Sequence, residues 1–336
     1  MTGYRVAVTG DQVRDDGSSI FGDLGLQRLR DAGLDWKVVP VPGARICAEQ
    51  VLGFDALLLM GDRAVDATTL AGGRLRHVAR FGAGYDQVDI AACTAAGVLV
   101  TNTPDGVRVP MAHAALTMVL ALAHELAPKD RLVREGRWDQ RASHQGRGLI
   151  GATVGVVGVG NVGAEIVRTF RQLGISVVAY NRTPRPEVLE PIGVPQLPLL
   201  EVAAASDFLV VAVAATAQTV CLIDADVLRA MRPEAYLVNL SRGMVVDEQA
   251  LVAALRENRL RGAALDVFRR EPLPLDSPLL TLDRVLLSPH SLCWTDGFAR
   301  GVADSALGAL IDVAQGRVPP HLVNPDALTS AGRSNR

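Results

Sequence analysis

The chain has 336 residues, of which 49% are hydrophobic and 21% charged, and its formal net charge is −2. This composition provides enough apolar residues for a folded core and excludes a largely disordered chain. The near-neutral charge argues against a protein that binds nucleic acid through its overall charge, because phosphates require a basic face.

Short apolar runs alternate with longer amphipathic stretches in the first hundred residues. The runs that we expect to form strands are Arg5–Thr9, Ala56–Met60, His77–Phe81 and Val98–Thr101. Helices are expected between them, for example at Phe21–Asp31 and Asp86–Ala96, and a long apolar helix is expected at Pro110–Leu126. This alternation predicts a parallel sheet covered by helices.

The second half of the chain repeats this alternation. The expected strands are Thr153–Val157, Ser176–Tyr180, Phe208–Ala212, Tyr236–Asn239, Gly262–Val267 and Val285–Leu287. The expected helices are Val162–Leu173, Glu248–Glu257 and Gly297–Gln315. The sequence therefore predicts an α/β protein with two doubly wound parallel-sheet units.

A glycine-rich turn joins the strand at Thr153–Val157 to the helix that follows it. It reads Gly158-Val159-Gly160-Asn161-Val162-Gly163. Gly158 permits a tight turn, Gly160 lets the backbone approach a pyrophosphate, and Gly163 lets the helix pack closely on the strand. The N–H groups of the first helical turn would face the phosphates. A glycine loop between a strand and a helix predicts a dinucleotide site.

The residues after the next strand indicate which dinucleotide binds. An NAD site places an acidic residue there to hold the adenine ribose, but this strand ends in Asn181-Arg182-Thr183. Arg182 can pair with a 2′-phosphate, and Asn181 and Thr183 can add hydrogen bonds. The sequence therefore favours NADP, with NAD as the alternative.

Three further strand ends carry polar side chains that suit acid–base chemistry. Arg242 follows the strand at Tyr236–Asn239, Glu271 lies after the strand at Gly262–Val267, and His290 follows the strand at Val285–Leu287. Ligands of doubly wound sheets bind at the carboxyl ends of their strands. These three side chains are therefore candidates for one active site.

The chain resembles the D-2-hydroxyacid dehydrogenase family, in particular its glyoxylate/hydroxypyruvate reductase branch. The resemblance covers nearly the whole sequence. Besides the glycine loop, it is carried by 82–86 (GAGYD), 100–104 (VTNTP), 242–247 (RGMVVD), 266–268 (DVF), 289–290 (PH) and 318–324 (VPPHLVN). It implies a flavodoxin-like substrate-binding domain formed by residues 1–102 and 291–336. Residues 103–290 would form the Rossmann-like NAD(P)-binding domain, with the active site in the cleft between the two.

The resemblance also implies a role for each site residue. Hydride would pass between the nicotinamide and C2 of a small 2-oxoacid or 2-hydroxyacid, with His290 as general acid and base. Glu271 would orient the His290 ring and stabilise its imidazolium form. Arg242 would bind the substrate carboxylate and polarise the carbonyl, and the N–H groups of Ala83 and Gly84 would bind that carboxylate too.

Asp266 is placed among the cofactor contacts by the same resemblance, and a homodimer is expected. Some positions depart from the family pattern. Leu292 and Trp294 are bulky where the family commonly has small residues, and Arg108 replaces a common threonine. A cleft-facing Arg108 would add a second cation beside Arg242 and favour a phosphorylated, phosphonate or dicarboxylic substrate. Because 32 of the 34 basic residues are arginines, a solvent-exposed Arg108 is the simpler interpretation.

The sequence thus predicts an NADP(H)-preferring D-2-hydroxyacid dehydrogenase that reduces 2-oxoacids such as glyoxylate or hydroxypyruvate. The alternatives are a dehydrogenase for a phosphorylated or phosphonate 2-hydroxyacid and, in a different class, a dinucleotide-sensing corepressor. We expect no metal site, no membrane segment and a cytoplasmic location. The four scattered cysteines and the lack of a long apolar N-terminal run are the basis for that location.

Overall fold

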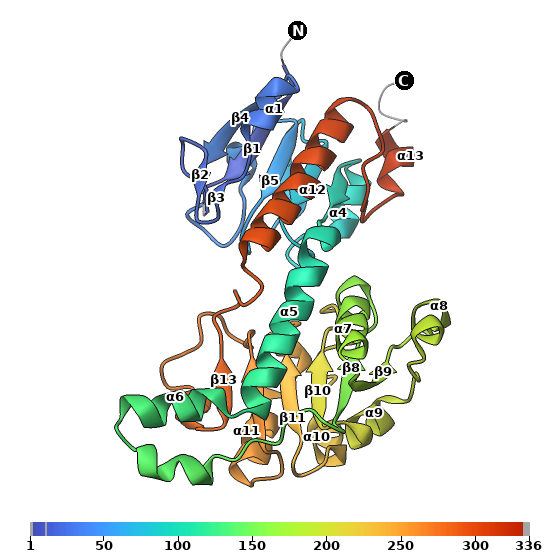
Figure 1. The fold of residues 1–336 in the computed structure, drawn as a ribbon. Helices are drawn as coiled ribbons and strands as arrows, with labels where there is room; N and C mark the ends of the chain where they lie inside the picture. Colours follow the sequence, from blue (N-terminus) through green and yellow to red (C-terminus); the bar gives the residue numbers. More distant parts are fainter. Residues whose placement is uncertain (1–2, 11, 332–336) are drawn as a thin grey trace. The chain divides into compact units, whose positions relative to one another are not determined.

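The computed structural model describes residues 3–10 and 12–331 and divides into two compact units (Figure 1). Unit 1 comprises the residues up to Val107 and those from Trp294 onward, and unit 2 comprises Arg108–Cys293. The chain passes between the units after residues 107 and 293, whereas the sequence placed these boundaries after residues 102 and 290.

Unit 1 contains a five-stranded parallel sheet in the order β4-β1-β5-β6-β7. Its strands are β1 (Arg5–Thr9), β4 (Asp35–Val39), β5 (Ala56–Leu59), β6 (His77–Arg80) and β7 (Leu99–Thr101). Counted along the chain, this order is 2-1-3-4-5, which is the flavodoxin-like arrangement. A small antiparallel hairpin, β2 (Ser18–Ser19) and β3 (Gly22–Asp23), follows β1.

Helices cover both faces of this sheet, as expected for buried parallel strands. They are α1 (Gln27–Asp31), α2 (Ala48–Val51), α3 (Ala67–Leu70), α4 (Ile90–Ala95), α12 (Asp296–Ala314) and α13 (Ala327–Ala331). Leu57, Leu59 and Val78 lie on the face that packs against α2, α3 and α4. The helix α12 packs against β6 and α1.

Unit 2 contains a six-stranded parallel sheet in the order β13-β12-β11-β10-β8-β9. Its strands are β8 (Thr153–Val157), β9 (Ser176–Tyr180), β10 (Phe208–Val211), β11 (Tyr236–Asn239), β12 (Gly262–Leu265) and β13 (Val285–Leu287). An isolated parallel bridge from Ala179 to Gln196 adds a rudimentary strand beside β9. With that strand counted, the order is the 3-2-1-4-5-6 order of a Rossmann fold, extended by one strand.

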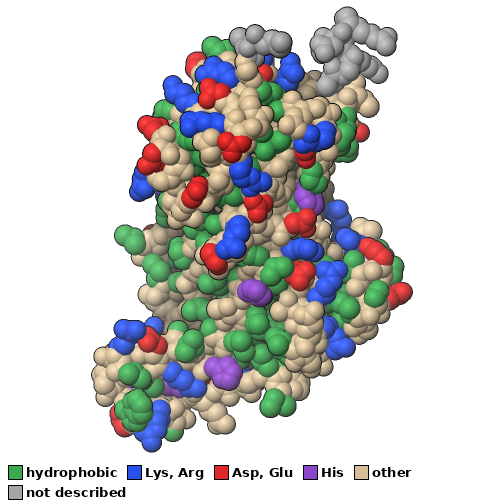
Figure 2. All heavy atoms as spheres, turned by 45° about the horizontal axis from the view of Figure 1, so that its top comes forward, with side chains coloured by type: hydrophobic (Ala, Val, Ile, Leu, Met, Phe, Trp, Pro, Cys, Tyr) green, Lys and Arg blue, Asp and Glu red, His purple; other side chains and the backbone are tan. Residues whose placement is uncertain are grey.

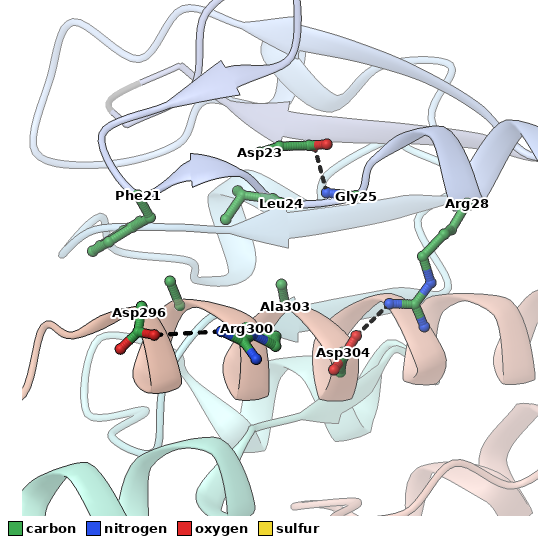
Figure 3. Close-up of a pocket in the computed structure, with 10 residues that line it drawn as sticks. Phe21, Asp23, Leu24, Gly25, Arg28, Asp296, Arg300, Ala303 and Asp304 are labelled. Carbon is green, nitrogen blue, oxygen red and sulfur yellow. Dashed lines mark hydrogen bonds and ion pairs between the residues drawn. The ribbon is translucent and has the colours of Figure 1, made fainter.

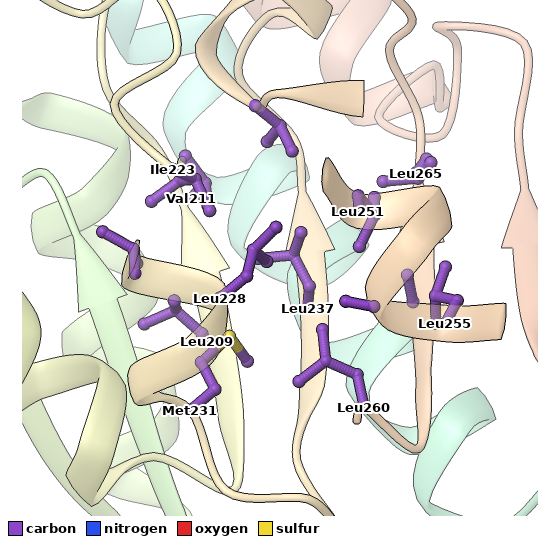
Figure 4. Packing of buried hydrophobic residues seen from close by; sticks show 14 of the residues in the cluster. Leu209, Val211, Ile223, Leu228, Met231, Leu237, Leu251, Leu255, Leu260 and Leu265 are labelled. Carbon is purple, nitrogen blue, oxygen red and sulfur yellow. The ribbon is translucent and has the colours of Figure 1, made fainter. Parts of the chain in front are cut away.

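The helices of unit 2 pack on this sheet around a continuous apolar core. They are α6 (Leu126–Arg134), α7 (Asn161–Gln172), α8 (Pro186–Leu189), α9 (Leu199–Ala205), α10 (Ala225–Ala230) and α11 (Glu248–Arg256). Four 3₁₀ turns accompany them at η1 (Trp138–Ser143), η2 (Glu190–Ile192), η3 (Gly243–Val245) and η4 (Pro278–Thr281). Figure 4 shows Leu209, Val211 and Leu237 of the strands facing Leu228 of α10 and Leu251 of α11.

The two α/β units confirm the predicted fold class, but three elements differ from expectation. The segment expected to be a helix from Phe21 becomes helical only at Gln27, because Gly22 and Gly25 adopt positive φ angles of 82° and 72°. The strand β4 was missed because Asp35 and Lys37 interrupt its apolar residues at the sheet edge.

The third difference is the long apolar helix, α5, which spans Pro104–Ala123 rather than Pro110–Leu126. Pro104 occupies its first position, where the missing N–H has no helical partner to lose, and Pro110 lies inside it. The helix ends before Glu125, whose φ of 49° is left-handed. Among the described residues, α5 alone is long and apolar enough to span a membrane, but more than half of it is buried, as in a core helix.

Figure 2 shows acidic and basic side chains intermixed on the face it displays. This mixture agrees with the small net charge of the chain and offers no extended basic surface there.

Candidate active site

The glycine loop of unit 2 has the geometry of a pyrophosphate cradle. Gly158 has a φ of 98°, and a Cβ on Gly163 would lie 1.8 Å from the Gly158 carbonyl oxygen, so both positions require glycine. A Cβ on Gly160 would meet nothing within 4 Å, so the space above this residue is open. Asn161, Val162 and Gly163 open α7, and their N–H groups have no partner inside the helix. These residues fit the diphosphate of a dinucleotide.

The end of β9 presents Arg182 next to this loop in the fold. The Asn181 Oδ1 accepts a 2.9 Å hydrogen bond from the Val159 N–H, and its Nδ2 donates to the Thr183 carbonyl at 2.7 Å. Asn181 is therefore occupied in joining β9 to the glycine loop. Arg182 and Thr183 are exposed, and among the described residues Arg182 makes no ion pair. The Arg182 guanidinium is thus available to an anionic ligand.

The loop after β11 is shaped by one buried amide. The Asn239 Oδ1 accepts hydrogen bonds from the N–H and the hydroxyl of Ser241, at 3.1 and 2.9 Å, and its Nδ2 donates to the Arg242 carbonyl at 3.1 Å. These bonds fix the backbone that carries Arg242. A Cβ on Gly243 would lie only 1.9 Å from the carbonyl carbon of Phe268, so this loop and the segment after β12 touch backbone to backbone.

Glu271 and His290 form a hydrogen-bonded pair at the same end of the sheet. The His290 Nδ1 lies 2.7 Å from the Glu271 Oε2, while the Glu271 Oε1 accepts a 2.8 Å bond from the Phe268 N–H. Burial alone would raise the pKa of the Glu271 carboxyl. The bonds from His290 and Phe268, together with the charges of His290 and Arg242, outweigh burial and lower that pKa. Glu271 is therefore an ionised acceptor near neutral pH.

The turn that follows His290 is held by Asp266. His290 has a φ of 53°, an unusual conformation for a residue other than glycine. The buried Asp266 carboxylate accepts the N–H groups of Ser291 and Leu292 at 3.1 and 3.3 Å. These two bonds hold the turn that carries His290, so Asp266 helps to position His290 through the backbone.

Cys293 lies in the same turn. Burial and the neighbouring Asp266 raise the pKa of the Cys293 thiol to about 12, which excludes a reactive thiolate.

The Ala83–Gly84 loop lies in unit 1, after β6. The Ala83 carbonyl accepts a 2.7 Å bond from the Asn102 side chain, and the Gly84 carbonyl accepts a 3.0 Å bond from Arg80. Among the described residues, the N–H groups of Ala83 and Gly84 donate no hydrogen bond. Two adjacent free N–H groups on a fixed loop can bind a carboxylate.

Arg108 lies in α5 and contacts the helix that follows the glycine loop. Its Nη1 is 3.8 Å from the Glu165 carboxylate of α7, which also pairs with Arg168 at 3.4 Å. The Glu165 charge offsets part of the Arg108 charge, so this contact does not favour a doubly anionic substrate.

Among the described residues, no group of three histidine, cysteine or acidic side chains is arranged to hold a metal ion.

Comparison with known proteins identifies the family. A family model described as the NAD-binding domain of D-isomer-specific 2-hydroxyacid dehydrogenases matches residues 116–291, more than half of the chain. The chain belongs to this family. It is therefore an NAD(P)-dependent oxidoreductase and a 2-hydroxyacid dehydrogenase, which confirms the resemblance seen in the sequence.

Individual relatives match most of the chain. A glyoxylate reductase from Thermococcus onnurineus is 40% identical over 290 residues, covering 84% of this chain and 86% of the relative. One from Korarchaeum cryptofilum is 36% identical over 298 residues, covering 87% and 90%. The structure of an NADPH-dependent glyoxylate/hydroxypyruvate reductase from Sinorhizobium meliloti, in complex with NADP and malonate, has 30% identity and a TM-score of 0.81. It covers 96% of this chain and 97% of that chain.

Arg242, Glu271 and His290 all lie in unit 2 of this dehydrogenase, whereas Ala83 and Gly84 lie in unit 1. Sequence reasoning missed the contributions of Asn239 and Gly243. The signal for Gly243 was its place directly after Arg242, but only the fold shows that it touches Phe268. No local signal marked Asn239, because its partners are backbone groups.

Proposed function

We propose that the protein is an NADP(H)-preferring 2-oxoacid reductase that acts on small substrates such as glyoxylate and hydroxypyruvate. The observation that carries this proposal is the 2.7 Å contact between His290 and an ionised Glu271, at the sheet end that also bears Arg242. The glyoxylate reductase names of the relatives support the substrate class.

His290 would protonate the substrate oxygen during reduction. Because its Nδ1 contacts Glu271, Nε2 is the ring atom that would deliver the proton. The ionised Glu271 favours the imidazolium form and fixes the ring plane. A bound nicotinamide would supply the hydride for C2 of the 2-oxoacid, and the proton from His290 would complete the 2-hydroxyacid.

Arg242 and the Ala83–Gly84 loop would bind the substrate carboxylate. The guanidinium can make charge-assisted hydrogen bonds to the carboxylate and to the carbonyl oxygen that gains negative charge. The two free N–H groups of the loop would add donors from unit 1. In this proposal unit 2 holds the dinucleotide and also carries Arg242 and His290.

The NADP preference rests on Arg182 and on the absence of an acidic residue at 181–183. Arg182 is exposed and unpaired among the described residues, and a 2′-phosphate would supply its missing anion. The S. meliloti relative, which was solved with NADP, supports this choice. NAD would leave the arginine without that contact.

The decisive assay measures oxidation of NADPH and of NADH with glyoxylate and hydroxypyruvate. The wild type should prefer NADPH, and Arg182→Ala should lower the NADPH-to-NADH ratio of kcat/KM by about 10- to 100-fold, as expected for a charged hydrogen bond. His290→Gln should lower kcat by about 10²- to 10⁴-fold, the usual contribution of a general acid. The control is Arg171→Ala. Arg171 is an exposed arginine in the last turn of α7 that donates to the Ile192 carbonyl, and its removal should leave the ratio unchanged.

Two outcomes would contradict the proposal. A wild-type preference for NADH would refute the role of Arg182. Binding of NADPH without its oxidation by any 2-oxoacid would favour the dinucleotide-sensing alternative. The homodimer stays a prediction. The exposed side chains of Leu126, Val133 and Trp138 in α6 and η1 form an apolar surface that a second subunit would cover. Light scattering of the purified protein is the test.

A further inference from the structure

Four aromatic side chains of unit 1 form a cluster beside the Ala83–Gly84 loop. The Phe21 ring stacks on Phe81 with centroids 5.9 Å apart and contacts Phe298 of α12 at 5.8 Å. Its third neighbour is Trp294, which it meets edge to face at 5.0 Å and 77°. Phe81 immediately precedes Gly82, so the segment that carries this ring leads directly into the Ala83–Gly84 loop.

The cluster has a buried half and an exposed half. Phe81 and Phe298 are buried, whereas Phe21 is partly exposed and Trp294 keeps 42% of its surface exposed. The edge-to-face contact holds the Trp294 ring in one orientation, so little conformational entropy remains to be lost on binding. The exposed half is therefore a preformed apolar surface.

Local structure places Phe21 for this contact. It lies with Ile20 in the two-residue turn between β2 and β3, and its N–H donates to the Ser19 hydroxyl at 3.0 Å. The Ile20 side chain is 59% exposed, while the Phe21 ring lies over the aromatic cluster. The hairpin thus delivers one of its two turn residues to the cluster and leaves the other in solvent.

Each charged side chain in the groove beside Phe21 has a partner, including Asp23, which accepts the Gly25 N–H at 2.8 Å. A groove of about 270 Å³ lies between the hairpin segment and α12. Figure 3 shows Phe21 at one end of it. Within it, Arg300 pairs with Asp296 at 3.4 Å and Arg28 pairs with Asp304 at 2.5 Å. Trp294 does not line this charged groove, so its exposed ring is an apolar surface separate from these ion pairs.

We propose that Phe21 and Trp294 form the acyl wall of the substrate site, and that they favour 2-oxoacids with an apolar side chain. The inference rests on the proposed function, because it takes the Ala83–Gly84 loop as the carboxylate anchor. Trp294 follows His290 by four residues in the chain, so the wall and the proton donor belong to neighbouring segments. Glyoxylate carries only hydrogen at C2 and cannot cover the two rings, whereas a branched or aromatic side chain can.

The test compares kcat/KM for 4-methyl-2-oxopentanoate and phenylpyruvate with kcat/KM for glyoxylate. Removing either ring in Phe21→Ala or Trp294→Ala should lower the apolar-to-glyoxylate ratio by about tenfold, the expected loss for one aromatic contact. The loss should lie mainly in KM, because the wall binds substrate and transition state alike. Trp294→Phe should restore most of the ratio, and Ile20→Ala, from the same turn, should leave it unchanged.

The inference is overturned if the ratio stays constant in both alanine variants, or if it rises because the rings exclude large side chains. It is also overturned if a wild type that reduces glyoxylate does not reduce either apolar 2-oxoacid. A wild type that reduces none of the three acids instead refutes the proposed function, so the two failures are distinguishable.

Discussion

Gly243→Ala tests whether the contact between two loops sets the active-site geometry. The new Cβ would lie 1.9 Å from the Phe268 carbonyl carbon, 2.1 Å from its oxygen and 2.3 Å from the Arg269 nitrogen. Ordinary contact begins at 3.4 Å, so the Arg242 loop and the segment leading to Glu271 must separate by about 1.5 Å. Both groups are backbone, so no side-chain rotation can relieve the overlap.

A displacement of this size has a predictable effect on the reaction. A misplacement of about 1 Å costs about 10²-fold in rate, so kcat/KM for glyoxylate should fall by at least about 10²-fold, or about 2.7 kcal/mol of transition-state stabilisation. Overpacking should also lower the free energy of unfolding by about 1–3 kcal/mol. NADPH affinity, measured by fluorescence titration, should change little, since the glycine loop and Arg182 lie on other strands.

The matched control is Gly308→Ala in α12, where a Cβ meets nothing within 4 Å. This variant should keep wild-type activity and gain about 0.5–1 kcal/mol of stability from reduced backbone entropy. Circular dichroism and thermal unfolding would show that both variants are folded. A folded Gly243→Ala enzyme with kcat/KM within threefold of the wild type would refute the reasoning.

Three further predictions concern stability and specificity. The folded state lowers the Glu271 pKa, so the stabilisation by this carboxylate is present above the unfolded pKa and is lost as pH falls through the folded pKa. The difference in Tm between wild type and Glu271→Gln should therefore shrink from pH 6 to pH 3. A constant difference would contradict this. Burial lowers the pKa of His77 to about 3, so below about pH 6.5 a proton binds to this residue in the unfolded chain but not in the folded one. In urea unfolding, His77→Leu should therefore lose less stability than the wild type between pH 7 and pH 5. An equal loss would count against a neutral buried His77. Because Glu165 pairs with Arg108, Arg108→Ala should change the kcat/KM ratio of oxaloacetate to glyoxylate by less than about threefold, whereas a tenfold fall would restore the second-cation hypothesis.

The family and the main catalytic candidates were predictable because their signals are local. The glycine loop, the arginine–glycine pair at 242–243 and the proline–histidine pair at 289–290 are short segments whose residue types meet a backbone or chemical requirement. Strands such as β8 and β10 were found close to their observed bounds, because uninterrupted apolar runs are typical of buried parallel strands. The edge strand β4 lacked such a run. The segment that begins at Phe21 has the amphipathic pattern of a helix, but the positive φ angles of Gly22 and Gly25 prevent a helix there.

The sequence by itself determined the fold class, and it singled out the dinucleotide loop and the candidates Arg242, Glu271 and His290, since each signal depends on residue type within a few positions. Only the tertiary structure decided which groups meet: Arg108 with Glu165, Gly243 with Phe268, and Phe21 with Trp294. The partners in these pairs are 25 or more residues apart in the chain. Their contacts follow from strand order and helix packing, which bring distant segments together and leave no periodic trace in the sequence.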